Sequence, residues 1–270
     1  MSKLNFKNNV IIITGASAGI GKELALQLAW QSAKLVLAAR DTVKLRTLVK
    51  ECNKLGGKAV AAKTDISDKL QCKRLINKTI KEFGRIDTLI NNAGLSMWAK
   101  FDEIKNPDML KQIMDVNYLG SVYTTFYALP YLKKSKGRIV GISSLTGKTG
   151  VPTRTGYAAS KHAMAGFFDS LRIELMNSGV SVTMIYPDFV ATEVRERALG
   201  KDGKPLKQSH IKESGIMTAE ECAAQIIDTA AKRKRELVMT PRAKAGLWLK
   251  LIAPKIVDNI ARKSIESGKT

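Results

Sequence analysis

A tyrosine and a lysine stand four residues apart in the stretch Tyr157-Ala-Ala-Ser-Lys161. This spacing puts both side chains on one face of a helix. A free phenol has a pKa of about 10, and a neighbouring ammonium group favours the phenolate and brings that pKa toward neutrality. Such a phenol can donate or accept a proton at working pH. A solvated Tyr/Lys pair is the alternative interpretation. The hydroxyl predicted to meet this pair is that of Ser144, although Ser143 is an alternative and either serine can instead cap a turn.

A glycine-rich stretch, Thr14-Gly-Ala-Ser-Ala-Gly-Ile-Gly21, lies directly between a predicted strand and a predicted helix. Its glycines let the backbone turn tightly and approach a pyrophosphate, while the helix N-terminus offers free N–H groups and the positive end of its dipole. Taken alone, a glycine-rich stretch can also be interpreted as an ordinary turn. At the first strand–helix junction it predicts a dinucleotide site, with the contacts Gly15, Ser17, Gly19, Ile20 and Gly21.

The residues after the second and third predicted strands bear on which dinucleotide binds. An Asp or Glu after the second strand would accept a hydrogen bond from the ribose 2′-OH of NAD. Here Ala39 is followed by Arg40, and a guanidinium suits a 2′-phosphate. Asp41 is the competing residue, which can also pair with Arg40 or cap the next helix. We therefore predict NADP(H). Asp65 and Ile66 are predicted to hold the adenine, although Asp65 is equally suited to an Asx turn.

Short apolar runs alternate with longer segments of helical periodicity along most of the chain. The runs predict seven strands, at residues 10–14, 34–38, 58–62, 88–91, 138–142, 180–186 and 236–239. The periodic segments predict helices at 20–30, 45–55, 70–83, 108–132, 155–176 and 218–232. Strands that are apolar on both faces and separated by helices indicate a parallel sheet covered on both sides. We expect a doubly wound α/β Rossmann fold in one dinucleotide-binding and catalytic domain over 1–240, followed by a basic amphipathic extension over 241–270.

The order of these motifs resembles the short-chain dehydrogenase/reductase family over about residues 5–240. The resemblance rests on Thr14-Gly15…Gly19-Ile20-Gly21, Asn91-Asn92-Ala93-Gly94, Asn117, Ser144, Tyr157…Lys161 and Pro187. The segments 143–148 and 166–168 resemble the 11β-hydroxysteroid dehydrogenase-like branch of that family. The chain departs from the family pattern at Pro187-Asp188, where Pro-Gly is usual, and this leaves the backbone path there open.

The resemblance implies a role for each matching residue. Tyr157 would be the general acid in carbonyl reduction and the base in the reverse reaction. Lys161 would lower the pKa of that phenol and hold the nicotinamide ribose, and Ser144 would donate to the substrate oxygen as negative charge develops. Asn117, by itself equally a surface helix residue, would anchor a water that links Lys161 to bulk solvent. The family pattern also assigns cofactor contacts to Asn92, Ala93, Pro187, Val190 and Thr192.

In this family the segment after the sixth strand closes over the substrate, which places a lid at about 191–217. The lid carries Arg195, Arg197, Lys201, Lys204, Lys207 and Lys212, as a solvated surface or as contacts for a phosphate or carboxylate. Apolar residues predicted in the pocket favour a lipid-like or aromatic carbonyl, although two of them, Met97 and Trp98, can equally be packing residues. The others are Leu95, Leu145 and Phe189. The alternative functions are a 3-oxoacyl-carrier-protein reductase and a dinucleotide-binding sensor without turnover.

The composition excludes several classes of protein. Hydrophobic residues make up 44% of the 270 and charged residues 26%, so disorder, collagen and coiled coil do not fit. Three cysteines without a CxxC pair or a His/Cys cluster predict reduced thiols and no metal site.

The formal charge of +21 suits nucleic acid, anionic lipid, acidic carriers or phosphorylated ligands. We expect no nucleic-acid partner, because the sequence has no base-reading helix, zinc finger or RNA-binding aromatic pair. Without a long apolar run or a signal-peptide core, the expected location is cytoplasmic.

The C-terminal segment is both basic and apolar. From residue 232 to 270 there are 11 basic and 3 acidic residues, and Trp248 lies within an apolar stretch. Such a helix suits the surface of a membrane, but it can also pack on its own domain or on a neighbouring subunit. All three interpretations stay open at this stage. By analogy with the family, a homodimer or homotetramer is expected to pair through the helices near 108–132 and 155–177.

Overall fold

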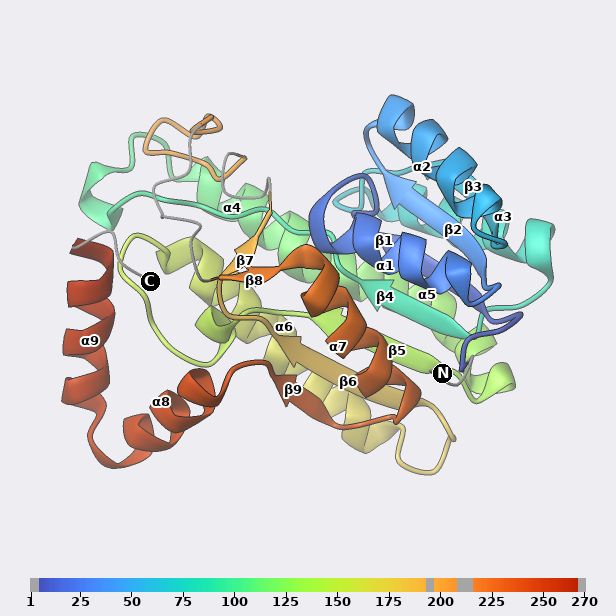
Figure 1. Ribbon diagram of the computed structural model, residues 1–270. Helices are drawn as coiled ribbons and strands as arrows, with labels where there is room; N and C mark the ends of the chain where they lie inside the picture. The colour runs from blue at the N-terminus through green and yellow to red at the C-terminus, as the bar shows by residue number, and fades with distance from the viewer. Residues whose placement is uncertain (1–4, 193–196, 208–215, 267–270) are drawn as a thin grey trace.

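The computed structural model describes residues 5–192, 197–207 and 216–266. Seven parallel strands form one sheet in the order β3-β2-β1-β4-β5-β6-β9, as Figure 1 shows. This arrangement confirms the predicted doubly wound Rossmann fold, and the strand ends fall within one residue of the prediction. The strands are β1 (Val10–Thr14), β2 (Lys34–Ala39), β3 (Lys58–Lys63), β4 (Thr88–Asn91), β5 (Arg138–Ile142), β6 (Ser181–Tyr186) and β9 (Glu236–Val238).

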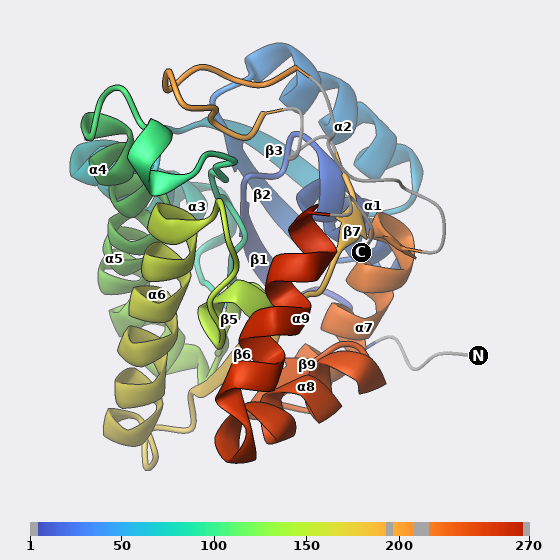
Figure 2. The same cartoon turned by 90° about the vertical axis from the view of Figure 1, so that its left-hand side faces the viewer.

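Helices cover both faces of the sheet (Figure 2). The helices packed on one face are α1 (Gly19–Trp30), α2 (Thr42–Lys54) and α7 (Ala219–Ala231). Those on the other face are α3 (Lys69–Phe83), α4 (Asp108–Met114), α5 (Gly120–Ser135) and α6 (Thr155–Glu174). The central strand explains why both layers form, because every residue of β1 is buried. Ile11 and Ile13 belong to the core under α1 and α7, whereas Ile12 belongs to the core under α3, α5 and α6.

The strand order fixes where a ligand can bind. From β1 the chain builds the sheet outward through β2 and β3, and then it returns to add β4, β5 and β6 on the other side of β1. Beside such a reversal, the loops that follow neighbouring strands diverge and leave a crevice at the carboxyl ends of the strands. The loops that follow β1 and β4 meet at this crevice, and they carry the glycine-rich stretch and the Asn-Asn-Ala-Gly motif.

Three segments differ in detail from the prediction. The helix expected at 108–132 is divided into α4 and α5 by a π-helical turn over Asp115–Leu119. A short parallel pair, β7 (Val190–Ala191) and β8 (Met217–Thr218), joins the two ends of the predicted lid. The C-terminal segment forms two helices, α8 (Pro241–Ile252) and α9 (Pro254–Glu266), which meet at a proline. In the parts of the chain that the structure describes, no helix combines the length and apolarity needed to cross a membrane.

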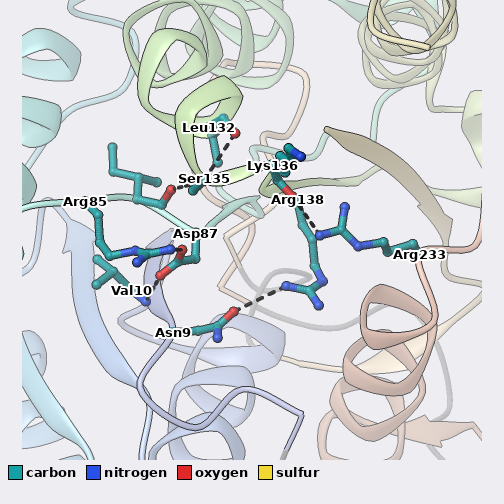
Figure 3. A network of polar contacts seen from close by, with 10 residues as sticks. Asn9, Val10, Arg85, Asp87, Leu132, Ser135, Lys136, Arg138 and Arg233 are labelled. Atoms are coloured by element: carbon teal, nitrogen blue, oxygen red, sulfur yellow. Dashed lines mark hydrogen bonds and ion pairs between the residues drawn. The ribbon is translucent and has the colours of Figure 1, made fainter. Parts of the chain in front are cut away.

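A polar network fastens the opposite edge of the sheet, where the strands begin (Figure 3). Asp87 accepts hydrogen bonds from the backbone N–H of Val10, at 2.9 Å, and from the guanidinium of Arg85. Arg138 donates to the side chain of Asn9, and Arg233 donates to backbone carbonyls, among them that of Lys136 at 2.7 Å. These arginines hold loops together at the edge of the sheet where the strands begin, opposite the edge with the crevice.

Candidate active site

A cavity of about 670 Å³ opens along the carboxyl ends of the strands. Loops after six of the seven strands line it, so residues far apart in the sequence meet there. Two predicted residues, Gly21 and Asn117, do not line the cavity and act from behind its wall. The predicted residues that do line it are Gly15, Ser17, Gly19, Ile20, Arg40, Asp65, Ile66, Asn92, Ala93, Ser144, Tyr157, Lys161, Pro187, Val190 and Thr192.

The N-terminus of α1 has no side-chain cap and therefore suits an anion. Helices α2, α3 and α7 begin with a side-chain cap, from Asp41, Asp68 and Thr218 respectively. The N-cap residue of α1 is Ala18, which offers no side-chain cap, and the first turn of the helix has no acidic residue. The start of the helix lies at the cavity wall, and its first N–H groups have no capping side chain among the described residues. This arrangement fits the pyrophosphate of a dinucleotide.

Two of the glycines are required by the close contacts of the loop. Gly15 has a φ of +65°, and a Cβ atom there would lie 2.7 Å from the Cα of Ala93. A Cβ atom on Gly21 would lie 2.4 Å from the carbonyl oxygen of Gly15 and 2.6 Å from the side-chain nitrogen of Asn92. A larger residue at either position would force the loop or its neighbours to move.

The loop after β4 is tied to the glycine-rich loop by hydrogen bonds. The hydroxyl of Thr14 accepts from the backbone N–H groups of Asn92, at 3.0 Å, and Ala93, at 3.1 Å. The side-chain amide of Asn92 donates to the carbonyl oxygens of Thr14 and Gly15. Asn92 thus holds the glycine-rich loop in place beside the cavity.

The end of β2 presents a cation to the cavity. Asp41 accepts from the backbone N–H groups of Val43 and Lys44 and so caps α2, one of the roles considered for it. The side chain of Arg40 is 72% exposed and lies 4.0 Å from the carboxylate of Asp65. Asp65 in turn accepts from the backbone and hydroxyl groups of Ser67, which makes it an Asx turn as well as a cavity residue.

Tyr157, Lys161 and Ser144 meet at one place on the cavity wall. The ammonium nitrogen of Lys161 lies 5.8 Å from the centre of the Tyr157 ring and donates to the carbonyl oxygen of Ile142 at 2.9 Å. Burial lowers the pKa of Lys161 to about 8. Burial also raises the pKa of the half-buried Tyr157, while the Arg154 guanidinium and a hydrogen bond with Ser144 act in the opposite direction. The three groups predicted to share one reaction are thus adjacent.

Asn117 lies in the π-helical turn and is completely buried, unlike a surface helix residue. Its side chain accepts from the backbone N–H of Leu95, at 2.7 Å, and donates to the carbonyl oxygen of the same residue at 2.9 Å. It also donates to the hydroxyl of Ser160, the residue before Lys161. Asn117 therefore connects the loop after β4 to the helix that carries Tyr157 and Lys161. A π-helical turn is a frequent feature of functional sites.

The Pro187-Asp188 departure from the family pattern has a structural role. The carboxylate of Asp188 accepts from the hydroxyl of Thr240, at 3.1 Å, and lies 3.7 Å from the guanidinium of Arg242. It braces the start of α8 against the loop after β6. Of the basic lid residues, Arg195 and Lys212 lie outside the described residues, and Arg197 lines the cavity.

The apolar part of the cavity differs slightly from the prediction. Leu95, Leu145 and Phe189 line it as expected. Met97 and Trp98 are absent from the lining, and Met97 is fully buried against its neighbours, which is the packing alternative. Additional lining residues include Val151, Arg154 and Ile265, from segments that the sequence analysis did not mark, and Leu199 from the predicted lid. None of these residues belongs to a motif in the sequence, so their place in the cavity is seen only in the structure.

Comparison with known proteins agrees with this geometry. The family model described as short chain dehydrogenase matches residues 9–202. The chain is 36% identical over 256 residues to the 11-beta-hydroxysteroid dehydrogenase-like 4A protein of Arabidopsis thaliana, covering 94% of this chain and 83% of that protein. It is 34% identical over 270 residues to the dehydrogenase/reductase SDR family protein 7-like of Dictyostelium discoideum, covering 98% and 84%.

A solved structure shares the fold. It is a short-chain dehydrogenase/reductase of Burkholderia phymatum in complex with NAD, with a TM-score of 0.83 and 24% identity, covering 94% of this chain and 96% of that one. The cavity, the glycine-rich loop and the Ser/Tyr/Lys cluster thus occur in a chain that relatives at above 30% identity match along nearly its whole length. The protein belongs to the short-chain dehydrogenase/reductase family of oxidoreductases and lies near its 11β-hydroxysteroid dehydrogenase-like branch.

Proposed function

We propose that the protein is an NADP(H)-dependent oxidoreductase that interconverts a carbonyl and a hydroxyl group on a hydrophobic or lipid-like substrate. The observation that carries this proposal is one continuous cavity. It runs past the uncapped N-terminus of α1 and Arg40 to the cluster of Ser144, Tyr157 and Lys161. One part of the cavity suits a dinucleotide, and the other suits proton transfer to a bound carbonyl.

The residues present fit a nicotinamide dinucleotide, which when bound supplies or accepts the hydride. The backbone of the glycine-rich loop and the start of α1 would hold the pyrophosphate. Arg40 would pair with the 2′-phosphate of NADP, since Asp41 is already engaged as a helix cap. The residues that would contact the remaining groups are Asp65, Ile66, Asn92, Ala93, Pro187, Val190 and Thr192.

The proton chemistry belongs to the protein. In the reductive direction the phenol of Tyr157 would donate its proton to the carbonyl oxygen, while the hydroxyl of Ser144 donates a hydrogen bond to the same oxygen as charge builds on it. Lys161, with a pKa of about 8, keeps most of its charge at neutral pH and stabilises the phenolate that remains. In the oxidative direction Tyr157 would accept the proton of the alcohol. Asn117 would hold the lysine helix and the loop after β4 in register.

The substrate is proposed from the lining of the cavity. Leu95, Leu145, Val151, Phe189 and Leu199 give the part near Tyr157 an apolar wall, which favours a lipid-like or aromatic carbonyl over a sugar. The Arabidopsis relative named above is called hydroxysteroid dehydrogenase-like, in agreement with this choice. A 3-oxoacyl thioester on an acidic carrier remains the alternative that the positive charge of the chain would suit.

The deciding experiment follows NADPH and NADH oxidation against steroid ketones, long-chain 3-oxoacyl thioesters, fatty aldehydes and small aromatic ketones. We expect turnover with NADPH on one hydrophobic class. Tyr157→Phe should bind NADPH as the wild type does and lose roughly 10²–10⁴-fold in kcat, the range for a positioned general acid. Near-wild-type turnover by this variant would contradict the role of Tyr157. Tight NADPH binding without turnover on any class would favour a sensor instead.

The proposal also includes two partners, a second copy of the chain and a membrane surface. The exposed apolar side chains of Phe126 on α5 and Ile173 on α6 support a homodimer or homotetramer that pairs through these helices. The exposed apolar and basic surface of α8 and α9 supports peripheral contact with a membrane. A hydrophobic or lipid-like substrate is compatible with delivery from a lipid phase.

A further inference from the structure

Arg154 is a second cation beside Tyr157. It is the residue immediately before α6, and it lines the cavity. Its guanidinium carbon lies 5.9 Å from the centre of the Tyr157 ring, and the ammonium nitrogen of Lys161 lies at 5.8 Å from the same point. The phenol is therefore approached by two positive groups at nearly the same distance from its ring.

Arg154 is held by specific contacts. One guanidinium nitrogen donates to the hydroxyl of Ser96 at 2.6 Å, and Ser96 is buried. The same guanidinium lies over the ring of Trp98, 4.5 Å from its centre, in a typical cation–π arrangement. Ser96 and Trp98 belong to the loop after β4, and the backbone N–H of Trp98 is itself bonded to the carbonyl oxygen of Leu199. The cation is thus fixed relative to the phenol.

The two cations differ in how they can act on the phenol. Lys161 is buried, its ammonium donates to the carbonyl oxygen of Ile142, and its pKa is lowered to about 8. Lys161 consequently loses its charge at a lower pH than the range in which a phenol with a raised pKa ionises. A guanidinium keeps its charge throughout that range. Arg154 lowers the pKa of Tyr157 against the effect of burial, and it continues to do so when Lys161 has lost its proton.

We propose that Arg154 is a positioning residue for the reaction, whose fixed guanidinium stabilises the phenolate form of Tyr157 and so sets the pH range in which the phenol exchanges its proton. This inference rests on the proposed function, because it needs Tyr157 as the acid and base. The other groups near the phenol are Lys161 on the same helix and the Ser144 hydroxyl. The remaining charged residues described along this cavity are Arg40, Asp41, Asp65, Asp188 and Arg197.

None of the described carboxylates along the cavity is a close partner of the phenol. Asp188 is engaged by Thr240 and Arg242. Asp41 and Asp65 follow β2 and β3, and β1 separates these strands from β4. The acidic groups described along this cavity thus have other partners, and the groups that act on the phenol among the described residues are Arg154 and the Ser144 hydroxyl, against the effect of burial.

The test replaces Arg154 with glutamine and with lysine and follows ionisation of the phenol directly. Ultraviolet difference titration of each protein against the same protein carrying Tyr157→Phe isolates this phenol from the other tyrosines. Arg154→Gln should raise the midpoint by about one pH unit, the size expected for one charge at this distance in a half-exposed site. Arg154→Lys should keep the midpoint near that of the wild type.

The kinetic counterpart is the pH profile of alcohol oxidation, for the alcohol made from the best carbonyl of the substrate panel. Because oxidation needs the phenolate, removing the cation should move the rise of kcat to higher pH and reduce kcat about tenfold below the wild-type midpoint. The KM for NADP should stay unchanged. Trp98→Leu, which removes the ring under the guanidinium without changing any charge, should shift the midpoint in the same direction by a smaller amount.

An unshifted phenol midpoint in Arg154→Gln, with kcat reduced equally at all pH values, would overturn the proposal and leave Arg154 as a packing residue. If Arg154→Gln does not fold, an unshifted midpoint in Trp98→Leu would overturn it equally. Failure of the proposed function is seen separately, as full turnover by Tyr157→Phe, since the ultraviolet titration reports on Arg154 whether or not the phenol is catalytic.

Discussion

The proposed preference for NADP(H) over NAD(H) depends on a single side chain, Arg40. Its guanidinium is mostly exposed and its 4.0 Å contact with Asp65 is loose, so the free-energy cost of turning it toward a 2′-phosphate is small. A charge-assisted pairing with a doubly charged phosphate is stronger than that contact. The neighbouring Asp41, which would otherwise favour a ribose 2′-OH, is engaged by two backbone N–H groups of α2.

We therefore expect Arg40→Ala to raise the KM for NADPH about tenfold, with little change in the KM for NADH and in kcat. Arg46→Ala is the matched control, because Arg46 is an exposed arginine on α2 that does not line the cavity. Steady-state kinetics with both cofactors measures the difference. An equal change in the two KM values would show that Arg40 does not read the 2′-phosphate.

At the scale of elements, the junction between β1 and α1 has to bring a turn, a helix end and the loop after β4 together at contact distance. Gly21 is the most constrained position in this junction, because a Cβ atom would strike the carbonyl oxygen of Gly15 and the amide of Asn92. Both neighbours belong to the wall of the proposed cofactor site. A substitution there should act on cofactor binding through the shape of the loop.

We expect Gly21→Ala to weaken NADPH binding at least tenfold and to lower the melting temperature, since a carbonyl group cannot move aside as a flexible side chain can. Gly166→Ala is the matched control within a helix. No atom lies within 4 Å of the added Cβ there, and alanine should stabilise α6 by about 0.5–1 kcal/mol. Calorimetric titration with NADPH and thermal unfolding give both readouts, and equal NADPH affinities in the two variants would contradict this account.

Elements that are specified by local sequence patterns could be predicted, and those that depend on tertiary contacts could not. The central strands have apolar residues on both faces, and the capping box of Thr218 and Glu221 marks the start of α7, so these elements were predicted almost to the residue. The π-helical turn was not predicted; it contains the buried Asn117, whose side-chain partners lie on another loop and another helix. Tertiary hydrogen bonds of this kind leave no periodic signal.

The site residues likewise divide into those that a sequence motif predicts and those that only tertiary contacts reveal. The predicted residues in the loops line the cavity because these loops follow strands, and strand ends gather at one edge of the sheet. Tyr157 and Lys161 line it from helix α6, whereas Gly21 and Asn117 do not line it. Met97 and Trp98 were predicted in the pocket from their apolar character, but the loop after β4 turns Met97 into the core. Arg154 was overlooked because a lone arginine before a helix has no meaning until Ser96 and Trp98 are seen to hold it.

At the scale of the whole molecule, the main question is what covers helices α8 and α9. None of the residues of α9 is buried, and α8 buries only Ala243. Trp248, Leu251 and Ile252 are 70%, 76% and 82% exposed, and Ile256 and Ile260 are more than half exposed. The interpretation that this segment packs on its own domain is therefore incomplete, because its largest apolar side chains face outward. Figures 1 and 2 show the two helices at the side of the molecule, apart from the layers that cover the sheet.

Charge distinguishes the two remaining candidates for covering this face, a second copy of the chain and a membrane surface. Helices α8 and α9 carry six basic residues against two acidic ones, in a chain with a formal charge of +21. A second copy placed symmetrically on this face would bring two strongly positive surfaces together, which is unfavourable. An anionic lipid surface accepts both the cations and the apolar side chains. Ile265 of α9 also lines the cavity, so a membrane at these helices would lie beside the site proposed for a hydrophobic substrate.

We expect the full-length protein to co-sediment with vesicles that contain phosphatidylserine and to bind those of phosphatidylcholine alone much more weakly. Binding should fall as salt screens the charges. The triple variant Trp248→Ser, Leu251→Ser, Ile252→Ser should bind at least about tenfold less, since each of these side chains is worth one to several kcal/mol when buried. The control is Val43→Ser with Leu70→Ser, which removes exposed apolar side chains from α2 and α3. Vesicle binding by the triple variant at the wild-type level would contradict lipid docking. If the wild-type protein does not bind vesicles and the triple variant differs from it in oligomeric state, the face of α8 and α9 belongs to an interface with a second copy.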